Sequence, residues 1–274
     1  MSNAVKEILR APAALHHWVK SAGWRAAVAQ TLSRAKKALG LPQPATLKFK
    51  PRQVTHPLTA RLRGSSDMSV FNQIFVVDEY ACVRDIQSPR LILDLGANVG
   101  YSSAYFLSCF PGATVVAVEP DPGNFELCRK NLEPYGDRAK VVAGAVWSKR
   151  GKLVLSRGTF GDGREWATQV RAMESQGDEA TVEGWDIPSL LQLAGETQID
   201  LLKVDIERSE LELFGGEGSQ AWLPKVRNIC IELHGRECQE VYLHALEDFD
   251  YEPGRSGELT ISRNLRPKTP PAGR

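Results

Sequence analysis

The sequence predicts an α/β fold in which a doubly wound, mostly parallel sheet carries helices on both faces and ends in a C-terminal antiparallel hairpin. The main observation is that short apolar runs alternate with helical patterns from Arg90 onward. This alternation is typical of parallel strands joined by right-handed crossovers. The last apolar segments, around Tyr251 and over Leu259–Ser262, indicate the closing hairpin.

Three regions are expected along the 274 residues, a length that allows one such domain and an appendage. Residues 1–56 are predicted to form a basic helical arm and a proline-rich linker, residues 57–264 the α/β domain, and residues 265–274 a disordered tail. Prolines between positions 42 and 57 disfavour a helix in the linker. The apolar run Val70–Val77 is expected to be a helix that covers the ligand site.

The core strands are predicted around Asp94 and over Thr114–Glu119, Lys140–Trp147, Ile199–Asp205 and Arg227–His234. Helical patterns cover Tyr101–Phe110, Asn124–Leu132 and Ser209–Phe214. Lys152–Ser156 is predicted as an added strand, and the polar, glycine-containing stretch Gly158–Ala180 as a mobile loop.

Charge is unevenly distributed, although the net charge is only +1. Residues 1–63 contain 12 Lys and Arg against one acid, Glu7, so the remainder of the chain is acidic. A basic arm can contact anionic lipid, nucleic acid or an anionic substrate, or it can pack back on an acidic domain. Trp18 and Trp24 in the arm leave open a peripheral membrane contact through residues 1–40.

Composition argues for a cytoplasmic protein. No apolar run reaches the length of about 18 residues that a membrane-spanning helix needs, and the N-terminus does not resemble a signal peptide. The five cysteines are scattered without a C-x-x-C pair, which indicates reduced thiols and argues against cysteine ligation of a metal.

A glycine turn follows the strand around Asp94. Gly96 and Gly100 lie four positions apart, directly before the helical run that begins at Tyr101. Glycine lets the backbone approach a ligand closely, and the start of a helix offers unpaired N–H groups. Together with the carboxylate of Asp94, this turn predicts a cofactor pocket.

The second predicted strand ends in another acid, Glu119, before the turn formed by Pro120, Asp121 and Pro122. An acid at this place in a doubly wound fold can accept both hydroxyls of a ribose. The alternative is a generic α/β turn with solvent-facing acids, which the combination of two carboxylates and two glycines disfavours.

The turn does not match a dinucleotide site. The G-x-G-x-x-G pattern places glycine against a pyrophosphate, but here Asn98 takes the second glycine position and Tyr101 the third. The charge of Asp94 would repel a phosphate and attract an ammonium group. These features predict S-adenosylmethionine, which has an amino-acid end and a ribose but no phosphate.

Candidates for chemistry follow the last two core strands, where a doubly wound sheet binds its ligands. Asp205 and Glu207 end the fourth strand; Glu232 and His234 end the fifth and point to the same side of it.

Methyl transfer from a sulfonium needs alignment, and an alcohol acceptor also needs a base. His234, with an unperturbed pKa of about 6.5 that leaves it largely neutral at pH 7, is the preferred base, with a purely structural histidine as the alternative. Asp205 and Glu207 could act as base, orient the acceptor or hold a divalent cation, for which two carboxylates alone are weak support.

These motifs resemble the FkbM family of S-adenosylmethionine-dependent methyltransferases. The similarity runs from Pro57 to His234 and rests on five segments: Leu93–Ser103, Val118–Asn124, Asp200–Glu207, Ile231–His234, and Arg63–Asp67 with Phe71 and Tyr80. It implies a class I methyltransferase (Rossmann-like) fold and O-methylation of sugars, polyketides or related metabolites. By position, it implies the cofactor residues Asp94, Gly96, Ala97, Asn98, Gly100, Tyr101, Glu119, Pro120, Gly144 and Ala145, the last two near the adenine.

One departure concerns the acceptor side. The family usually continues the Asp-x-Glu pair with glycine and a small residue, whereas this chain has Arg208 and Ser209. A bulky cation there could reshape the acceptor pocket, bind an anionic acceptor or weaken the enzyme.

The leading hypothesis is an O-methyltransferase whose acceptor, a glycan or small hydroxylated metabolite, enters between the Arg61–Tyr80 segment and the strand ends with Asp205 and His234. A non-catalytic S-adenosylmethionine-binding protein that docks through its basic arm is the alternative, favoured by Arg208. The basic arm also permits a nucleic-acid methyltransferase, which the acidic domain and the absence of an Asn/Asp-Pro-Pro-Tyr/Phe motif disfavour.

Overall fold

A computed structural model of the protein describes residues 44–156, 169–172, 181–216 and 218–269, with isolated positions between 19 and 42. The chain divides into two compact units, Met1–Ala81 and Cys82–Arg274, and each is described by itself. The predicted helical arm lies mostly outside the described residues.

The first unit contains an antiparallel pair of strands, β1 (Thr46–Phe49) and β2 (Leu58–Arg61). Helix α2 (Asp67–Phe71), the π-helical segment η1 (Asn72–Val76) and the 3₁₀ segment η2 (Glu79–Val83) follow. The buried carboxylate of Asp67 forms an ion pair of 2.7 Å with Arg61, which joins β2 to α2. The helix predicted over Val70–Val77 is confirmed, and its role as a cover of the ligand site stays a prediction.

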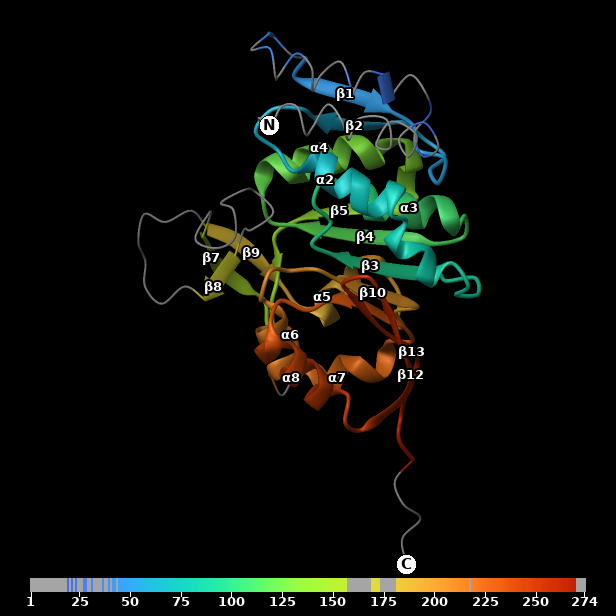
Figure 1. The fold of residues 1–274 in the computed structure, drawn as a ribbon. Coiled ribbons are helices and arrows are strands. Elements are labelled where there is room, and N and C mark those ends of the chain that lie inside the picture. The colour runs from blue at the N-terminus through green and yellow to red at the C-terminus, as the bar shows by residue number, and fades with distance from the viewer. Residues whose placement is uncertain are drawn as a thin grey trace, which may run out of the picture. The chain divides into compact units, whose positions relative to one another are not determined.

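The second unit is built on a seven-stranded sheet with the order β12-β13-β11-β10-β3-β4-β5 (Figure 1). Five strands are parallel, while β13 runs antiparallel to β11 and β12. The strand bounds are β3 (Leu91–Leu95), β4 (Thr114–Glu119), β5 (Ala139–Ala143), β10 (Leu201–Val204), β11 (Ile229–Glu232), β12 (Phe249–Ser256) and β13 (Leu259–Pro267). The predicted mostly parallel α/β sheet with a C-terminal antiparallel hairpin is confirmed.

Helices cover both faces of this sheet, as Figure 1 shows. One face carries α3 (Tyr101–Cys109) and α4 (Pro122–Leu132). The other carries α5 (Ile187–Ala194), α6 (Glu210–Gly215), α7 (Ser219–Trp222) and α8 (Arg236–Ala245). Leu91, Leu93 and Leu95 of β3 belong to the core beneath this second group of helices, while the whole strand is buried. The sheet is therefore doubly wound.

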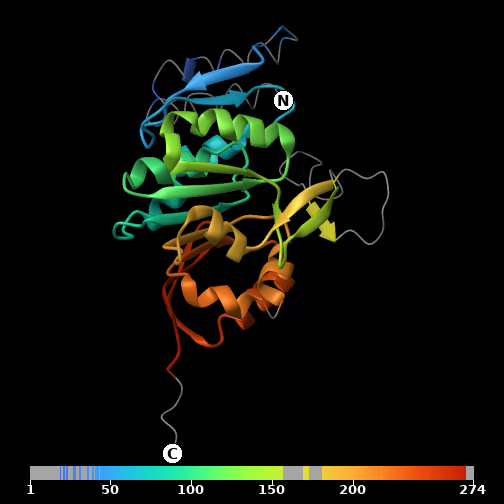
Figure 2. The same cartoon turned by 180° about the vertical axis from the view of Figure 1, so that it is seen from behind.

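A smaller four-stranded sheet stands beside the large one (Figure 2). Its strands are β6 (Ala145–Val146), β7 (Gly151–Ser156), β8 (Gln169–Ala172) and β9 (Thr181–Trp185). The prediction of a single strand over Lys140–Trp147 is wrong, because the chain leaves the large sheet at Gly144. Gly144 has a φ of 144°, and a Cβ atom there would lie 2.4 Å from the carbonyl oxygen of Glu183. Glycine thus permits the change of sheet.

Two further predictions need correction. Strand β8, paired antiparallel with β7, falls inside the stretch Gly158–Ala180 that was predicted to be a mobile loop; the rest of that stretch lies outside the described residues. Strand β13 continues to Pro267, into the tail predicted to be disordered over residues 265–274. Among the described residues, no helix has the length and apolar character needed to cross a membrane.

Candidate active site

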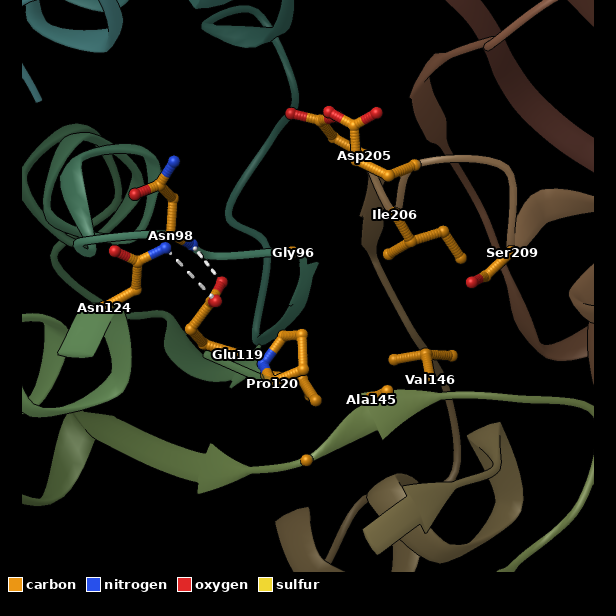
Figure 3. Close-up of a pocket in the computed structure, with 13 residues that line it drawn as sticks. Gly96, Asn98, Glu119, Pro120, Asn124, Ala145, Val146, Asp205, Ile206 and Ser209 are labelled. Carbon is orange, nitrogen blue, oxygen red and sulfur yellow. Dashed lines mark hydrogen bonds between the residues drawn. The ribbon is translucent and has the colours of Figure 1, made fainter. Parts of the chain in front are cut away.

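A pocket lies at the carboxyl ends of the strands of the large sheet, where β4 and β10 flank β3 on opposite sides (Figure 3). This switch point is where doubly wound folds bind their ligands. The cavity volume of the pocket is about 70 Å³. It is lined by Gly96, Asn98, Val118, Glu119, Pro120, Asn124, Gly144, Ala145, Val146, Asp205, Ile206, Glu207 and Ser209.

Gly96 determines how the loop after β3 passes the pocket. Its φ is 78°, and a Cβ atom would lie 1.8 Å from the carbonyl oxygen of Asp205. The backbone N–H groups of Gly96 and Ala97 both donate to the carbonyl oxygen of Val118, at 3.0 Å each. The loop is therefore fixed against β4 on one side and against the end of β10 on the other, with no space for a side chain.

Glu119 reaches the pocket from the end of β4. Its carboxylate accepts backbone N–H groups of Asn98 at 2.8 Å and Asp121 at 2.9 Å, and Figure 3 shows hydrogen bonds to it from Asn98 and Asn124. Burial raises the pKa of Glu119 to about 7, against the opposing effect of these hydrogen bonds. Since a carboxylate offers about four lone-pair sites, it can still accept hydroxyl groups of a ligand.

Asn98 contributes an acceptor that the described residues do not satisfy. Its Oδ1 atom is buried and has no hydrogen-bond partner among them, although Asn98 lines the pocket. Such an unpaired buried acceptor costs roughly 1–3 kcal/mol, and an ammonium or hydroxyl group of a ligand would remove that cost. With the carboxylate of Glu119 and the close backbone at Gly96, the site fits the amino-acid and ribose parts of S-adenosylmethionine.

The structure places six of the ten predicted cofactor residues in the lining: Gly96, Asn98, Glu119, Pro120, Gly144 and Ala145. The other four, Asp94, Ala97, Gly100 and Tyr101, lie outside the lining. Gly100 has a left-handed φ of 82°, and a Cβ atom there would lie 2.9 Å from the Sγ atom of Cys128. The assignment of these four positions as cofactor residues stays a prediction.

Asp94 is fully buried in a network of its own. Its Oδ2 atom accepts the hydroxyl groups of Ser102 and Ser103, at 2.6 Å each. Its Oδ1 atom lies 3.1 Å from Nζ of Lys203, which is only 2% exposed. Lys203 also donates to the carbonyl oxygen of Gly96 at 2.7 Å. The carboxylate expected to attract the cofactor's ammonium group is thus already paired with a buried cation, and it holds the loop and α3 in place.

The three predicted catalytic residues lie together at the β10 side of the pocket. Nε2 of His234 lies 3.7 Å from Oδ1 of Asp205 and 3.7 Å from Oε2 of Glu207. On the other side of the imidazole, Nδ1 lies 3.0 Å from Oε1 of Glu210, a carboxylate with no exposed surface. Residues from the end of β10, from the turn after it and from beyond β11 therefore form one cluster.

This environment changes the protonation of His234. Burial lowers the pKa of the imidazole, but the hydrogen bond to Glu210 and the charges of Asp205, Glu210 and Glu207 outweigh it and raise the pKa to about 9. This pKa lies above the unperturbed value of about 6.5 on which the expectation of a largely neutral His234 rests. Burial raises the pKa of Glu207 to about 7, opposed by the charge of His234.

Several residues of the site were missed. Asn124, Val146 and Ser209 line the pocket, but nothing in their sequence context distinguishes them. Lys203 and Glu210 offered a usable signal, because charged residues inside apolar runs are rarely buried without a partner. Lys203 stands in the run Leu201–Val204, and Glu210 precedes the apolar positions of α6.

Comparison with known proteins places this site in a family. Over 163 residues the chain is 29% identical to the 2-O-methyltransferase NoeI of Sinorhizobium fredii, covering 55% of this chain and 65% of that protein. It is 28% identical over 201 residues to the AMB antimetabolite synthetase AmbE of Pseudomonas aeruginosa, covering 61% of this chain and 9% of that protein. It is 26% identical over 176 residues to the 31-O-demethyl-FK506 methyltransferase FkbM of Streptomyces tacrolimicus, covering 55% and 67%.

The chain thus spans less than two thirds of the length of NoeI and a small part of AmbE. The model of the methyltransferase FkbM domain matches residues 94–253, more than half of the chain and the part that contains every residue of the pocket. The predicted resemblance is confirmed: the chain belongs to the FkbM family of methyltransferase domains, whose cofactor is S-adenosylmethionine.

Proposed function

We propose that this protein is an O-methyltransferase that moves a methyl group from S-adenosylmethionine to a hydroxyl group of a glycan or small hydroxylated metabolite. The observation that carries the proposal is the position of the cluster formed by Asp205, Glu207 and His234. Asp205 and Glu207 line the same pocket as Glu119 and Asn98. Groups suited to a proton-bearing acceptor and groups suited to the cofactor therefore share one cavity.

On the cofactor side, Glu119 would accept the ribose hydroxyl groups, and Asn98 would accept a donor through its unsatisfied Oδ1 atom. Gly144 and Ala145, which line the same pocket, would hold the adenine, since their small size leaves room for a ring. When bound, the cofactor supplies a methyl group that is already activated by the adjacent sulfonium. The protein then contributes alignment and exclusion of water.

On the acceptor side, Asp205, Glu207 and His234 orient the hydroxyl group for in-line displacement, and a carboxylate of this cluster takes up its proton. Positioned acid–base groups of this kind contribute factors of roughly 10²–10⁴ to a rate. The names of two relatives, a 2-O-methyltransferase and a 31-O-demethyl-FK506 methyltransferase, favour oxygen as the acceptor atom. They differ in substrate, which leaves a glycan or a small metabolite as the acceptor class.

The test is to incubate the purified protein with methyl-labelled S-adenosylmethionine and a fractionated lysate of its host. Label should enter a carbohydrate or small-metabolite fraction with the unmodified protein and not with Glu119→Ala. Label in nucleic acid would replace this proposal with a nucleic-acid methyltransferase. Cofactor binding without any labelled product would contradict catalysis.

One observation favours a second candidate, a cofactor-binding protein that docks on a membrane surface through its basic arm. Arg208 has a left-handed φ angle of 76° at the position where related proteins usually carry glycine, so the acceptor side departs from the family pattern. Liposome flotation of the full chain and of a variant without residues 1–40 tests this candidate. Arm-dependent binding to anionic vesicles together with absent turnover would favour docking.

A further inference from the structure

We propose that Asp205, Glu207 and His234 bind a divalent metal ion at the acceptor side of the pocket. Each side chain offers one ligand atom, and the three atoms lie within 4.8 Å of one another. The donors are two carboxylates and an imidazole. Beyond the carboxylate pair visible in the sequence, the structure adds a nitrogen ligand from a distant strand.

The spacing of the cluster fits a shared ion better than direct contact. Nε2 of His234 lies 3.7 Å from an oxygen of Asp205 and 3.7 Å from an oxygen of Glu207, whereas a charged N–H donor usually lies about 2.7–2.9 Å from a carboxylate oxygen. Metal ligands lie roughly 2.0–2.2 Å from an ion, so two ligands of one tetrahedral site are roughly 3.3–3.6 Å apart. The two distances from His234 exceed this range by only a few tenths of an ångström, and the carboxylate oxygens of Asp205 and Glu207 lie within 4.8 Å of each other.

His234 is also held in the manner of a metal ligand. Its Nδ1 atom faces Oε1 of Glu210 at 3.0 Å, and the Glu210 side chain has no exposed surface. Histidines that bind metals usually donate their second ring nitrogen to such a carboxylate, which fixes both tautomer and ring orientation. With Nδ1 committed to Glu210, Nε2 is directed at Asp205 and Glu207. Oε1 of Glu232 lies 3.8 Å from the same Nε2.

The local charges favour a cation as well. Asp205, Glu207, Glu210 and Glu232 surround a single imidazole. Lys203 lies 3.8 Å from Asp205 but is closer to Asp94, at 3.1 Å. Arg208 forms its ion pair of 2.6 Å with Glu237 instead. The four carboxylates therefore exceed the positive charge near them, which a divalent ion would balance.

Mixed carboxylate and imidazole ligands suit first-row ions such as Mn²⁺, Fe²⁺ or Zn²⁺. The role of the ion, although not the binding site, rests on the function proposed above. A divalent ion next to Asp205 and Glu207 would bind the oxygen of the acceptor hydroxyl and lower its pKa. That would make a hydroxylated acceptor, rather than an amine, the substrate class that this side of the pocket selects.

The experiment is isothermal titration of the chelator-treated full chain with MnCl₂ and ZnCl₂. We expect one ion per chain, with an affinity that falls at least tenfold in both Glu207→Gln and His234→Ala. The matched control is His244→Ala, which removes a surface histidine that pairs with Glu247 at 3.1 Å and should leave the affinity unchanged. Retained binding of S-adenosylhomocysteine shows that the variants are folded.

The proposal is overturned if the unmodified chain binds neither ion, or if His244→Ala weakens binding as much as His234→Ala. Since the titration involves no turnover, its result is separate from that of the transfer assay. Stoichiometric metal binding without any methylated product would preserve the metal site and contradict the proposed function. Methyl transfer by a chain that binds neither ion would support the proposed function and contradict the metal site.

Discussion

The two sides of the pocket are held by different kinds of interaction. On the cofactor side, Gly96, Asn98 and Glu119 are fixed through backbone hydrogen bonds and close backbone packing. On the acceptor side, Asp205 and His234 face each other across partly exposed side chains, 34% and 20% exposed, at a distance longer than a hydrogen bond. The geometry of the cofactor side is therefore determined by the main chain, whereas that of the acceptor side depends on the charges of its side chains.

This difference separates binding from chemistry in a testable way. A cofactor common to a whole family can be bound by main-chain geometry that tolerates few substitutions. Side chains at the ends of β10 and β11 can vary with the acceptor while the sheet beneath them, buried throughout β10, is unchanged. Changes on the cofactor side should therefore abolish binding, whereas changes on the acceptor side should alter turnover and leave binding intact.

The largest effect on cofactor binding is expected for Gly96→Ala. The added Cβ atom would lie 1.8 Å from the carbonyl oxygen of Asp205, so the loop must move away from β10 and lose its present shape. We expect the affinity for S-adenosylhomocysteine, measured by calorimetry, to fall by at least about 100-fold, since close backbone approach is what glycine provides.

The control is Gly112→Ala, because a Cβ atom at Gly112 meets nothing within 4 Å. It should bind the cofactor product as the unmodified protein does. Equal affinities for the two variants would show that the loop is not held as the structure indicates.

On the acceptor side, His234→Ala should lower turnover by roughly 10²–10⁴, the range for acid–base groups, because Asp205 and Glu207 lose the imidazole that lies beside them. Its affinity for S-adenosylhomocysteine should be unchanged, because His234 does not line the pocket and contacts Asp205, Glu207 and Glu210 instead. His244→Ala serves as the control for removing a histidine. Unchanged turnover in His234→Ala would remove this residue from the mechanism.

The same division explains what sequence analysis could predict. The turn at Gly96 and the acid at Glu119 are local features, each determined by a strand and the few residues after it, and both line the pocket. The pairing of Asp94 with Lys203, and of His234 with Glu210, joins distant parts of the chain across neighbouring strands or helices. Those contacts pair Asp94 with a buried cation and raise the pKa of His234, and no local pattern contains them.

The small sheet was predicted only in part for a related reason. Strand β7 has an apolar pattern that identified it, whereas β8 pairs with β7 from within a polar, glycine-containing stretch. The break at Gly144 was missed because the apolar run continues through it, from β5 into β6. Its cause is the close approach of Glu183 and Trp185 on β9.

A smaller effect is expected from pH on the cofactor side. The pKa of Glu119 is raised to about 7 by burial, with a further contribution from the charge of Asp121, although hydrogen bonds from Asn98, Asp121 and Asn124 oppose the rise. A ribose needs the ionised carboxylate as acceptor, so affinity for S-adenosylhomocysteine should decrease below pH 7, by up to about tenfold per pH unit. Above pH 7 it should be constant.

Glu119→Ala should bind weakly and without this pH dependence, which calorimetry at pH 6 and pH 8 would show. The effect on folding has the opposite sign. Because the folded-state pKa lies above the ordinary value of 4.5, the contribution of Glu119 to the stability of the ligand-free protein is fully present below pH 4.5 and is lost as the pH rises through 7. Affinity that increases toward low pH would contradict the proposed ribose contact.

The smallest effect concerns the left-handed turn on the acceptor side, at Arg208, whose φ is 76°. A non-glycine residue in this conformation costs about 1 kcal/mol or more, so Arg208→Gly should be more stable than Arg208→Ala by about 1 kcal/mol in urea unfolding. Both variants lose the exposed ion pair with Glu237, and the comparison therefore isolates the effect of the backbone conformation.

Arg236, which begins α8 and pairs with Glu240 at 2.7 Å, offers the matched control. There alanine should be the more stable replacement by up to about 1 kcal/mol, because glycine is unfavourable in a helix. If alanine is the more stable replacement at both positions, the turn at Arg208 is not strained. The presence of arginine instead of glycine at this position would then reflect the acceptor alone.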